Sequence, residues 1–467
     1  MGKTTDIINS PDYTKWLVLL SVGLGTFMSA LDASVVNVSL PVITRDFQSS
    51  ITQIEWVVTI YLLTVSCLLL AFGRLGDMQG HKRVYTFGFV IFILSSALCG
   101  LSTSAGMLIG LRAMQAIGAA MLFANSPAIL TGNFPAAQRG QALGLQATLT
   151  YLGLAVGPSL GGFLTQHFGW QAVFYINVPI GLLALFFCLR FIPNDRRQTN
   201  GERFDWIGAG LFLFGMVGLL FVLNQGQSWG WGSLPTLALA VFALLCLVFF
   251  VRLEIRSENP MLDLNLFRQR VFSFSVLSAL LNYMSMYCII FLLPFYLIQA
   301  RGFSPAHSGL ILTVQAVVMS LTAPISGYFS DRVSPRWLAT IGMAILAAGL
   351  GMLSFLQAVT PQWYIAISLA VTGLGTGMFI SPNNNVLLGS APRNRQGIAS
   401  GILATARNVG MVLGVGLAGA VFTTVLGHGE LAADTGGIFR AIQSSFVVGA
   451  GLAIVGIFTS FLRSGSE

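Results

Sequence analysis

The chain has 467 residues, of which 55% are hydrophobic and 9% are charged, and its net charge is +8. A water-soluble domain carries about 25% charged residues, so this composition excludes a soluble protein and predicts a polytopic helical membrane protein. The basic excess does not indicate nucleic acid here, because the position of basic residues along such a chain reports membrane topology. The five cysteines lie in apolar segments without ligand spacing, which predicts neither disulfides nor a metal site.

Apolar runs of about 20 residues, the length of a membrane-spanning helix, recur along the whole chain. They predict fourteen spans at 14–39, 51–73, 83–102, 106–132, 139–165, 170–192, 205–224, 233–252, 271–299, 306–329, 336–357, 361–390, 396–426 and 438–463. With the N-terminus in the cytoplasm, most Lys and Arg residues between the spans fall on the cytoplasmic side. We therefore expect both termini in the cytoplasm and a multi-pass protein in the lipid bilayer of a bacterial inner membrane.

The chain repeats itself after about 255 residues. The loop 73–83, GRLGDMQGHKR, recurs in weaker form at 327–336, and the glycines of 140–162 recur at 397–419. Matched segments cross the membrane in the same direction, which predicts two parallel six-helix halves, the architecture of an alternating-access transporter. The predicted domains are an N-terminal six-helix bundle at 1–198, a two-helix insert at 199–262 and a C-terminal six-helix bundle at 263–467.

One apolar stretch of the first half combines spaced glycines with a proline. Gly153, Gly157 and Gly161 are four residues apart and share one helix face, which lets two helix backbones approach closely in lipid. Pro158 removes a backbone hydrogen bond and should bend the helix. The later copy has Val415 in its place, so we expect only the first half to carry a bent, close-packed helix. A tight helix crossing without a functional role is the alternative.

Asp32 is an acid placed well inside a span, where a carboxylate is costly and by default marks an ion or proton path. Arg112 enters the fourth span from the outside, and at ~1.5 Å rise per residue the two side chains lie at similar depth. We predict that they pair as the proton-coupling residues, with Asp32 alternating between a proton and a cationic substrate and Arg112 setting its proton affinity. A buried ion pair that only orders the bundle is the alternative. Glu55, which begins the second span, is predicted to be a solvated interfacial residue, and a second proton carrier is the alternative.

A second cation, Arg407, lies inside the thirteenth span without an obvious acidic mate, and either lines a water-filled cavity or binds helix-end carbonyls. The ninth span carries Tyr283, Tyr287, Phe291 and Phe295 at fourfold spacing. Such a stripe suits large apolar cations through stacking and cation–π contact, or it faces lipid or a neighbouring helix. The candidate substrate contacts are Asp32, Phe27, Met28, Asn125, Gln146, Asn282, Tyr283, Met286, Tyr287, Gln315 and Arg407.

Six segments in order carry a family resemblance: 31–41 (LDASVVNVSLP), 73–83, 108–120 (LIGLRAMQAIGAA), the glycine stretch 144–162, 170–181 (WQAVFYINVPIG) and 407–414 (RNVGMVLG). They resemble the motifs of the fourteen-span drug:proton antiporters of the major facilitator superfamily, of the QacA and EmrB kind. Ala116 stands where the family usually has glycine. The resemblance implies a cytoplasmic latch at 73–83 and a seal between the halves at the glycine stretch. The gating residues expected from it are Gly73, Arg74, Asp77, Gly80, Arg83, Gly153, Gly157, Pro158, Gly161, Gly162 and Asp331.

We therefore expect a monomeric, proton-coupled antiporter that exports hydrophobic, cationic small molecules, with protons as the coupling ion and no other cofactor. A transporter of the same fold with a physiological cargo, such as a lipid, an amino acid, a siderophore or a metal–tetracycline complex, is the alternative. An intramembrane enzyme is disfavoured, because the four histidines are scattered over loops and span edges and build no catalytic cluster. A receptor or scaffold is disfavoured by the intact Asp32, Arg112 and glycine motifs.

Overall fold

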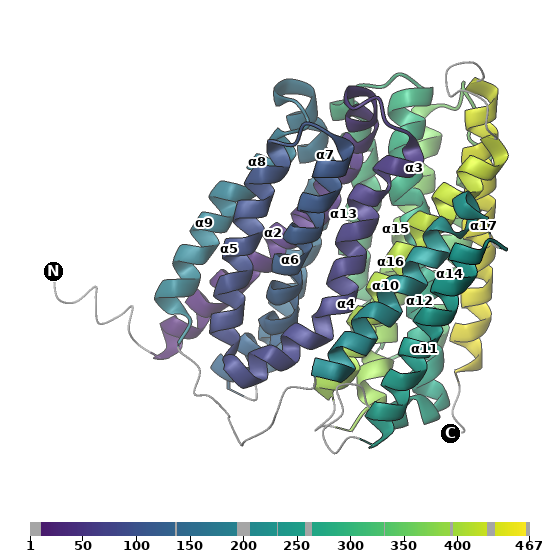
Figure 1. Ribbon diagram of the computed structural model, residues 1–467. Helices are drawn as coiled ribbons and strands as arrows, with labels where there is room; N and C mark the ends of the chain where they lie inside the picture. Colours follow the sequence, from purple (N-terminus) through teal and green to yellow (C-terminus); the bar gives the residue numbers. More distant parts are fainter. Residues whose placement is uncertain are drawn as a thin grey trace.

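The computed structural model describes residues 11–135, 138–193, 206–230, 232–256, 264–330, 332–392, 396–426 and 435–463. Regular structure in these ranges is helical throughout (Figure 1). Among them, 14 helices are long and apolar enough to cross a membrane, which confirms the predicted number of spans. The first helix extends through Pro41 to Asp46, beyond the predicted end, since a membrane-embedded helix tolerates an internal proline.

The helical elements are α2 (Pro11–Asp46), α3 (Ile51–Ile54), α4 (Trp56–Gln79), α5 (His81–Gly100), α6 (Ala105–Asn133), α7 (Arg139–Phe168), α8 (Ala172–Tyr175), α9 (Asn177–Phe191), α10 (Trp206–Trp229), α11 (Leu234–Arg256), the 3-10 turn η2 (Leu264–Arg268), α12 (Arg270–Phe295), the π-helical turn η3 (Tyr296–Ala300), α13 (Pro305–Ser330), α14 (Pro335–Leu353), α15 (Gln362–Ser390), α16 (Gln396–Leu426) and α17 (Thr435–Leu462).

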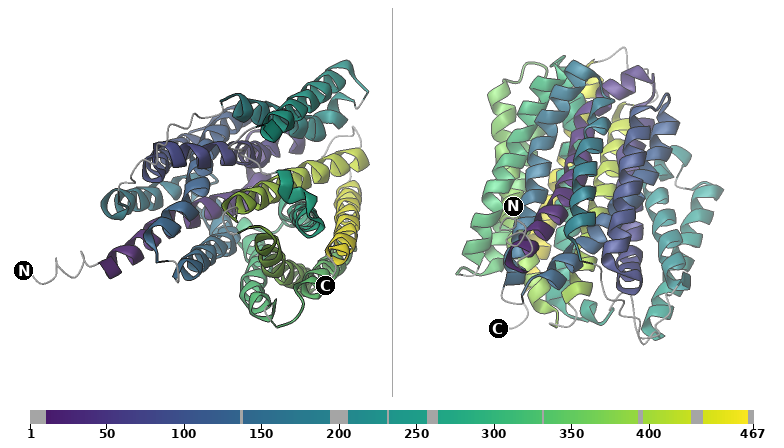
Figure 2. Two further views of the ribbon diagram at one scale, coloured as in Figure 1. Left: turned by 90° about the horizontal axis from the view of Figure 1, so that it is seen from below. Right: turned by 90° about the vertical axis from the view of Figure 1, so that its left-hand side faces the viewer.

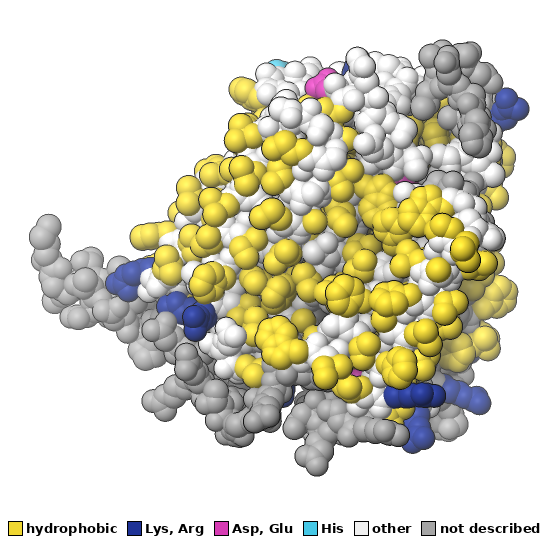
Figure 3. All heavy atoms as spheres, viewed as in Figure 1, with side chains coloured by type: hydrophobic (Ala, Val, Ile, Leu, Met, Phe, Trp, Pro, Cys, Tyr) yellow, Lys and Arg dark blue, Asp and Glu magenta, His cyan; other side chains and the backbone are white. Residues whose placement is uncertain are grey.

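The outer surface carries a broad apolar band. Figure 3 shows hydrophobic side chains covering the middle of the visible face, and Leu94, Phe186 and Phe249 are among the exposed apolar residues. An apolar surface of this extent suits lipid and would be a liability in water. Most Lys and Arg side chains visible in Figure 3 gather at its lower end, which the positive-inside rule assigns to the cytoplasm.

The two halves pack by the same scheme. Helix α2 packs against α7 and α9, as α12 packs against α16 and α17. Helix α6 packs against α4 and α5, as α15 packs against α13 and α14. Glycines explain one matched contact: a Cβ on Gly118 would lie 2.7 Å from the Gly88 carbonyl oxygen, and a Cβ on Gly375 would lie 2.7 Å from that of Gly342. The repeat predicted from the sequence is therefore present in the packing.

The helix pair α10–α11 lies along the outside of the two halves (Figure 2). Helix α10 contacts α4 of the first half and α16 of the second, and the rings of Trp56 and Phe221 stack 5.1 Å apart across one of these contacts. The predicted domain boundaries, near residues 198 and 262, lie outside the described residues. The two halves meet mainly through α7 with α13 and through α4 with α16, and α12 also contacts α2.

Candidate functional site

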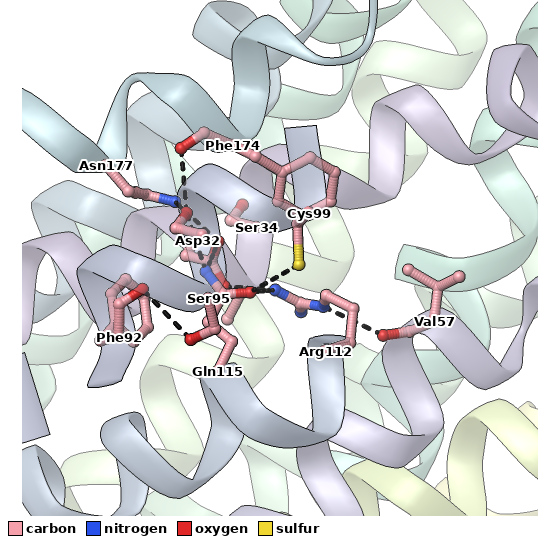
Figure 4. A network of polar contacts seen from close by, with 12 residues as sticks. Asp32, Ser34, Val57, Phe92, Ser95, Cys99, Arg112, Gln115, Phe174 and Asn177 are labelled. Carbon is pink, nitrogen blue, oxygen red and sulfur yellow. Dashed lines mark hydrogen bonds and ion pairs between the residues drawn. The ribbon is translucent and has the colours of Figure 1, made fainter. Parts of the chain in front are cut away.

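A buried polar network surrounds Asp32 on α2 (Figure 4). Arg112 of α6 donates from Nη1 to Asp32 Oδ2 at 2.6 Å, which confirms the predicted pair. Gln115 of α6 and Asn177 of α9 donate to the other oxygen, Oδ1, at 3.0 and 2.8 Å. Asp32 is 0% exposed and Arg112 is 1% exposed. Both carboxylate oxygens are therefore occupied by protein donors and closed to a substrate in this conformation.

A second layer of hydrogen bonds holds these donors in place. The Ser96 hydroxyl accepts from Gln115 at 3.0 Å and from Asn177 at 3.1 Å, and donates to the Phe174 carbonyl at 2.9 Å. Gln115 Oε1 accepts from Arg112 at 2.7 Å. Arg112 and Gln115 are three residues apart and share one face of α6, so a single helix presents both. The network thus ties α2, α5, α6 and α9 to one carboxylate.

Gln115, Asn177 and Ser96 were not predicted as site residues. All three are fully buried. Gln115 and Asn177 lie within the quoted segments 108–120 and 170–181, and each places an amide inside an apolar span. Such an amide needs a partner in lipid, which is the signal that could have identified them.

The other side of Arg112 faces α4 of its own half. Its Nε donates to the Val57 carbonyl at 3.2 Å, and its guanidinium lies 4.1 Å from the centre of the Tyr61 ring. The Tyr61 hydroxyl is buried without a hydrogen-bond partner among the described residues, and the side chain interacts electrostatically with Tyr287 of α12. Arg112 thus lies between the carboxylate of Asp32 and the ring of Tyr61.

The prediction that Glu55 is a solvated interfacial residue is wrong. Its side chain is 2% exposed, between the start of α4 and helix α16. A Cβ on Gly419 would overlap its carboxylate, so the glycine is what lets α16 approach it. Glu55 is therefore a buried residue at the contact between the halves and not a solvated one.

The spaced glycines of α7 pack within their own half. A Cβ on Gly153 would lie 2.6 Å from the Phe27 carbonyl oxygen, and one on Gly161 would lie 2.5 Å from the Val35 carbonyl oxygen, both on α2. Between them, Ser34 of α2 donates to the Leu154 carbonyl at 3.0 Å. That carbonyl is the one Pro158 leaves without its helical donor. The Ser34 hydroxyl on α2 thus replaces the backbone hydrogen bond that Pro158 removes from α7.

The opposite face of α7 contacts the other half. A Cβ on Gly162 would overlap the Pro305 carbonyl oxygen, and a Cβ on Gly309 of α13 would overlap the Pro158 carbonyl oxygen. The Ser159 hydroxyl lies 2.5 Å from that of Thr313. All of these contacts lie toward the extracellular ends of α7 and α13. On the cytoplasmic side, a Cβ on Gly144 would meet nothing within 4 Å. The halves are thus closely joined at their extracellular ends.

Close packing also occurs in the second copy of the glycine stretch. A Cβ on Gly410 would lie 2.5 Å from the Leu280 carbonyl oxygen of α12, and one on Gly414 would lie 3.0 Å from Tyr287 Cβ. The expectation that only the first half is close-packed is therefore wrong. What the first copy has alone is the proline and the serine hydrogen bond that accompanies it.

The segment 73–83 contains the end of α4, a turn at Gly80 and the start of α5, at the cytoplasmic end. Asp77 Oδ1 lies 3.3 Å from His81 Nε2, and His81 Nδ1 lies 2.8 Å from Asn125 Oδ1. Asn125 Nδ2 donates to the carbonyls of Phe72 and Met121. Both ring nitrogens of His81 thus face oxygen acceptors, which a protonated imidazole satisfies. Asn125, expected among the substrate contacts, lies with this turn instead.

The glycines of this turn differ in role. Gly80 has φ 98° and makes the turn between α4 and α5. Gly73 and Gly76 are helical, because α4 continues to Gln79. A Cβ on Gly76 would overlap the Asn125 side chain, whereas one on Gly73 would meet nothing within 4 Å. Of the remaining gating candidates, Arg74 is half-buried and Arg83 exposed, and Asp331 lies outside the described residues.

Several substrate candidates face the interior of their own half. Met28 is fully buried and lies against Gly181 of α9, and Asn282 Nδ2 lies 3.3 Å from Met343 Sδ of α14. The backbone of Phe27 forms part of the glycine contact with α7. The remaining candidates are the buried Met286 and Gln315 and the half-buried Gln146.

Arg407 lies where the two halves meet. It interacts electrostatically with Tyr283 and Tyr287 of α12 and with Tyr151 of α7, and of these Tyr283 is also a side-chain hydrogen-bond partner. The side chain is half-buried, and its Nε has no hydrogen-bond partner among the described residues. No carboxylate in the described part of the chain pairs with it. These contacts place the arginine among tyrosines and not on helix-end carbonyls.

Known proteins are similar to this chain in sequence and in fold. Its sequence is 34% identical over 96% of its length to a riboflavin transporter of Clostridioides difficile, 98% of which is covered. It is 32% identical over 88% of its length to a multidrug resistance protein of Mycobacterium tuberculosis, 77% of which is covered. A bacterial homologue of the human lysosomal transporter Spinster, in an inward-facing and unoccupied conformation, has a TM-score of 0.72 at 17% identity, covering 96% of this chain and 97% of the other. The model of the Major Facilitator Superfamily matches residues 22–255 and 275–466, and the chain belongs to this family of membrane transporters.

Proposed function

We propose that this chain is a proton-coupled antiporter that exports hydrophobic small molecules, drugs among them, as a monomer in a bacterial inner membrane. The observation that carries this proposal is the carboxylate of Asp32, fully buried in a span and paired with Arg112 at 2.6 Å. Intramembrane acids mark ion and proton paths by default. The similarity to a multidrug resistance protein supports small-molecule export.

The proton acts on the network around Asp32 and not by direct exchange with substrate. Ionised Asp32 is held by donors from Arg112, Gln115 and Asn177. A proton on the carboxyl group removes the charge that Arg112 neutralises, which frees the guanidinium to rearrange against Tyr61. This coupling is indirect, whereas the sequence predicted that substrate and proton would compete for Asp32 itself.

The movement would be a rocking of the two halves. The extracellular ends of α7 and α13 are joined through Gly162 and Gly309, whereas a Cβ on Gly144, in the cytoplasmic part of α7, would meet nothing within 4 Å. This arrangement supports an inward-facing step of the cycle, in which cargo enters from the cytoplasm. Binding between two parallel repeats is the usual position in such transporters.

The test is proton-coupled exchange in everted vesicles, using a panel of hydrophobic drugs together with riboflavin. We expect Asp32→Asn to reduce substrate-driven proton release at least tenfold. Asp46→Asn is the matched control, because Asp46 lies on the same helix and accepts one hydrogen bond, from Trp170 at 2.9 Å. Normal exchange by Asp32→Asn would show that Asp32 is not the coupling residue.

A double variant separates coupling from a purely structural ion pair. Asp32→Asn alone leaves the charge of Arg112 buried and unpaired, which is expected to destabilise the fold. Combining it with Arg112→Gln removes that charge. If the pair only orders the bundle, the double variant regains exchange together with stability. If Asp32 carries the proton, the double variant regains thermal stability and remains uncoupled.

A physiological cargo is the second candidate function. The relative that is a riboflavin transporter matches almost end to end, over 96% of this chain and 98% of its own length. A metabolite with a planar ring system therefore competes with drugs as the natural cargo. Counterflow of riboflavin in proteoliposomes, inhibited or not by the drug panel, distinguishes the two.

A further inference from the structure

We propose that the cargo of this transporter is a planar aromatic molecule carrying an acidic oxygen, and that Arg407 binds that oxygen between the two halves. The inference deepens the proposed transport function and rests on it. It reverses the charge expected from the sequence, which predicted cationic cargo. Three observations carry it, concerning the arginine, the tyrosines around it and the acids of the site.

The guanidinium of Arg407 lacks the counterion that a cation at this depth requires. Its Nε is buried without a hydrogen-bond partner, and no carboxylate in the described ranges pairs with it. Arg301 at the extracellular end is the contrast, since its Nη1 donates to the Tyr296 hydroxyl at 3.1 Å and to the Thr360 carbonyl at 2.7 Å. Arginine binds planar oxyanions through its fork of donors. An acidic oxygen on the cargo would supply the missing partner.

The tyrosines define the body of the ligand. Tyr151 comes from α7 of the first half, and Tyr283 and Tyr287 come from α12 of the second, so the cluster spans both halves. Aromatic side chains bind flat rings through offset or edge-on stacking, and their hydroxyls offer polar contacts at the ring edge. A ligand bound by residues of both halves is exposed alternately as the halves rock. This placement fits a cargo site and does not fit a lipid-facing stripe.

The acids near this region are not available to a cationic cargo. Both oxygens of Asp32 already accept hydrogen bonds, and its side chain is 0% exposed. Glu55 is buried behind Gly419, at the contact of α4 with α16. A cation entering between the halves therefore meets the charge of Arg407 without an accessible carboxylate. The balance of charge favours an anion.

The cluster also lies next to the coupling network. Tyr287 interacts electrostatically with both Arg407 and Tyr61, and the centre of the Tyr61 ring lies 4.1 Å from the Arg112 guanidinium. Binding of an acidic oxygen at Arg407 can therefore reach Asp32 through two tyrosines and one arginine. A cargo that neutralises the charge of Arg407 would change the electric field at Asp32.

The test uses two fluorescent three-ring dyes of similar size and opposite charge. Resorufin is a planar anion at alkaline pH, and pyronin Y is a planar cation. Fluorescence anisotropy of each dye is followed during titration with the purified full-length chain. We expect the wild-type chain to bind resorufin at least tenfold more tightly than pyronin Y. Arg407→Gln should lose at least tenfold in resorufin affinity and none in pyronin Y affinity.

Two further variants keep the test decisive. Arg407→Lys retains the charge and loses the planar fork, so it should keep the preference for the anion with weaker binding. Arg301→Gln is the matched control, since Arg301 already has protein partners, and it should leave both affinities unchanged. If Arg407→Gln fails to fold, the preference of the wild-type chain and of Arg407→Lys decides the question.

The inference is overturned if the wild-type chain prefers pyronin Y, or if Arg407→Gln weakens both dyes equally. Its failure is separate from failure of the proposed function. Proton release that depends on Asp32, together with a preference for cations, would leave the antiporter intact and remove the anion site. A preference for anions that depends on Arg407, without any proton release, would support the anion site and rule out the proton-coupled antiporter.

Discussion

Replacing Gly162 by alanine should shift the transporter away from its extracellularly closed conformation. The added methyl group would overlap the Pro305 carbonyl oxygen of α13, a backbone atom that cannot turn aside. The neighbouring substitution Gly161→Ala places a methyl group 2.5 Å from the Val35 carbonyl oxygen of α2, inside the same half. Adjacent glycines of α7 therefore make different contacts: Gly162 contacts the other half, and Gly161 contacts its own half.

The size of the shift follows from the cost of overpacking. Inserting a methyl group into a packed contact costs about 1–3 kcal/mol. For Gly162→Ala this cost applies when the halves are joined at α7 and α13, and it disappears when they separate there. The ratio of open to closed conformations should therefore rise by about 5-fold to 150-fold. For Gly161→Ala the cost applies in both conformations, so the ratio should stay the same while the fold loses stability.

Spin-label distances measure this ratio directly. Cysteines placed at Phe168, which is 67% exposed at the end of α7, and at Val359, which is 83% exposed in the other half, report the extracellular separation. The five native cysteines are buried, which favours selective labelling. We expect a longer distance to gain population in Gly162→Ala alone, and the unfolding temperature to fall in Gly161→Ala. Identical distance distributions for the two variants would refute the assignment of the two faces of α7.

Two further predictions concern single contacts. Ser34→Ala leaves the carbonyl that Pro158 frees without its donor, so thermal unfolding in detergent should show a loss of about 0.6–2 kcal/mol. The same change should cost little in a Pro158→Ala background, and equal losses in both backgrounds would disprove the compensation. Gly76→Ala should displace the Asn125 side chain and reduce vesicle transport several-fold, whereas Gly73→Ala, with open space around it, should not. Equal effects of the two glycine changes would count against a specific role for the cytoplasmic turn.

The central pair was predictable because charge and topology restrict it strongly. Asp32 and Arg112 each needed a partner in lipid, and the order of the spans put them at the same depth. The uncharged donors around them could not be assigned in this way. Gln115 and Asn177 each have several polar neighbours within reach, and only the packing of α5, α6 and α9 selects among them.

The wrong expectations share one cause, since each depends on a helix from elsewhere in the chain. Glu55 is buried because α16 approaches it at Gly419, more than three hundred residues later. Asn125 joins the cytoplasmic turn because α6 ends beside α4 and α5. A periodic pattern assigns a residue to a face of its own helix, and it does not identify the segment that covers that face.

The contact between α7 and α13 has a consequence for leakage of protons and ions. The two backbones touch directly, because Gly162 lies against the Pro305 carbonyl and Gly309 lies against the Pro158 carbonyl. The Ser159 and Thr313 hydroxyls lie beside this contact. Such a closure excludes a file of water by shape, and the described residues that make these contacts carry no titratable group, since His307 on the same turn of α13 faces Gln362. Its tightness should therefore be independent of pH and of ionic strength on either side of the membrane. A bacterium could thus acidify its surroundings or enter brackish water without this barrier beginning to conduct.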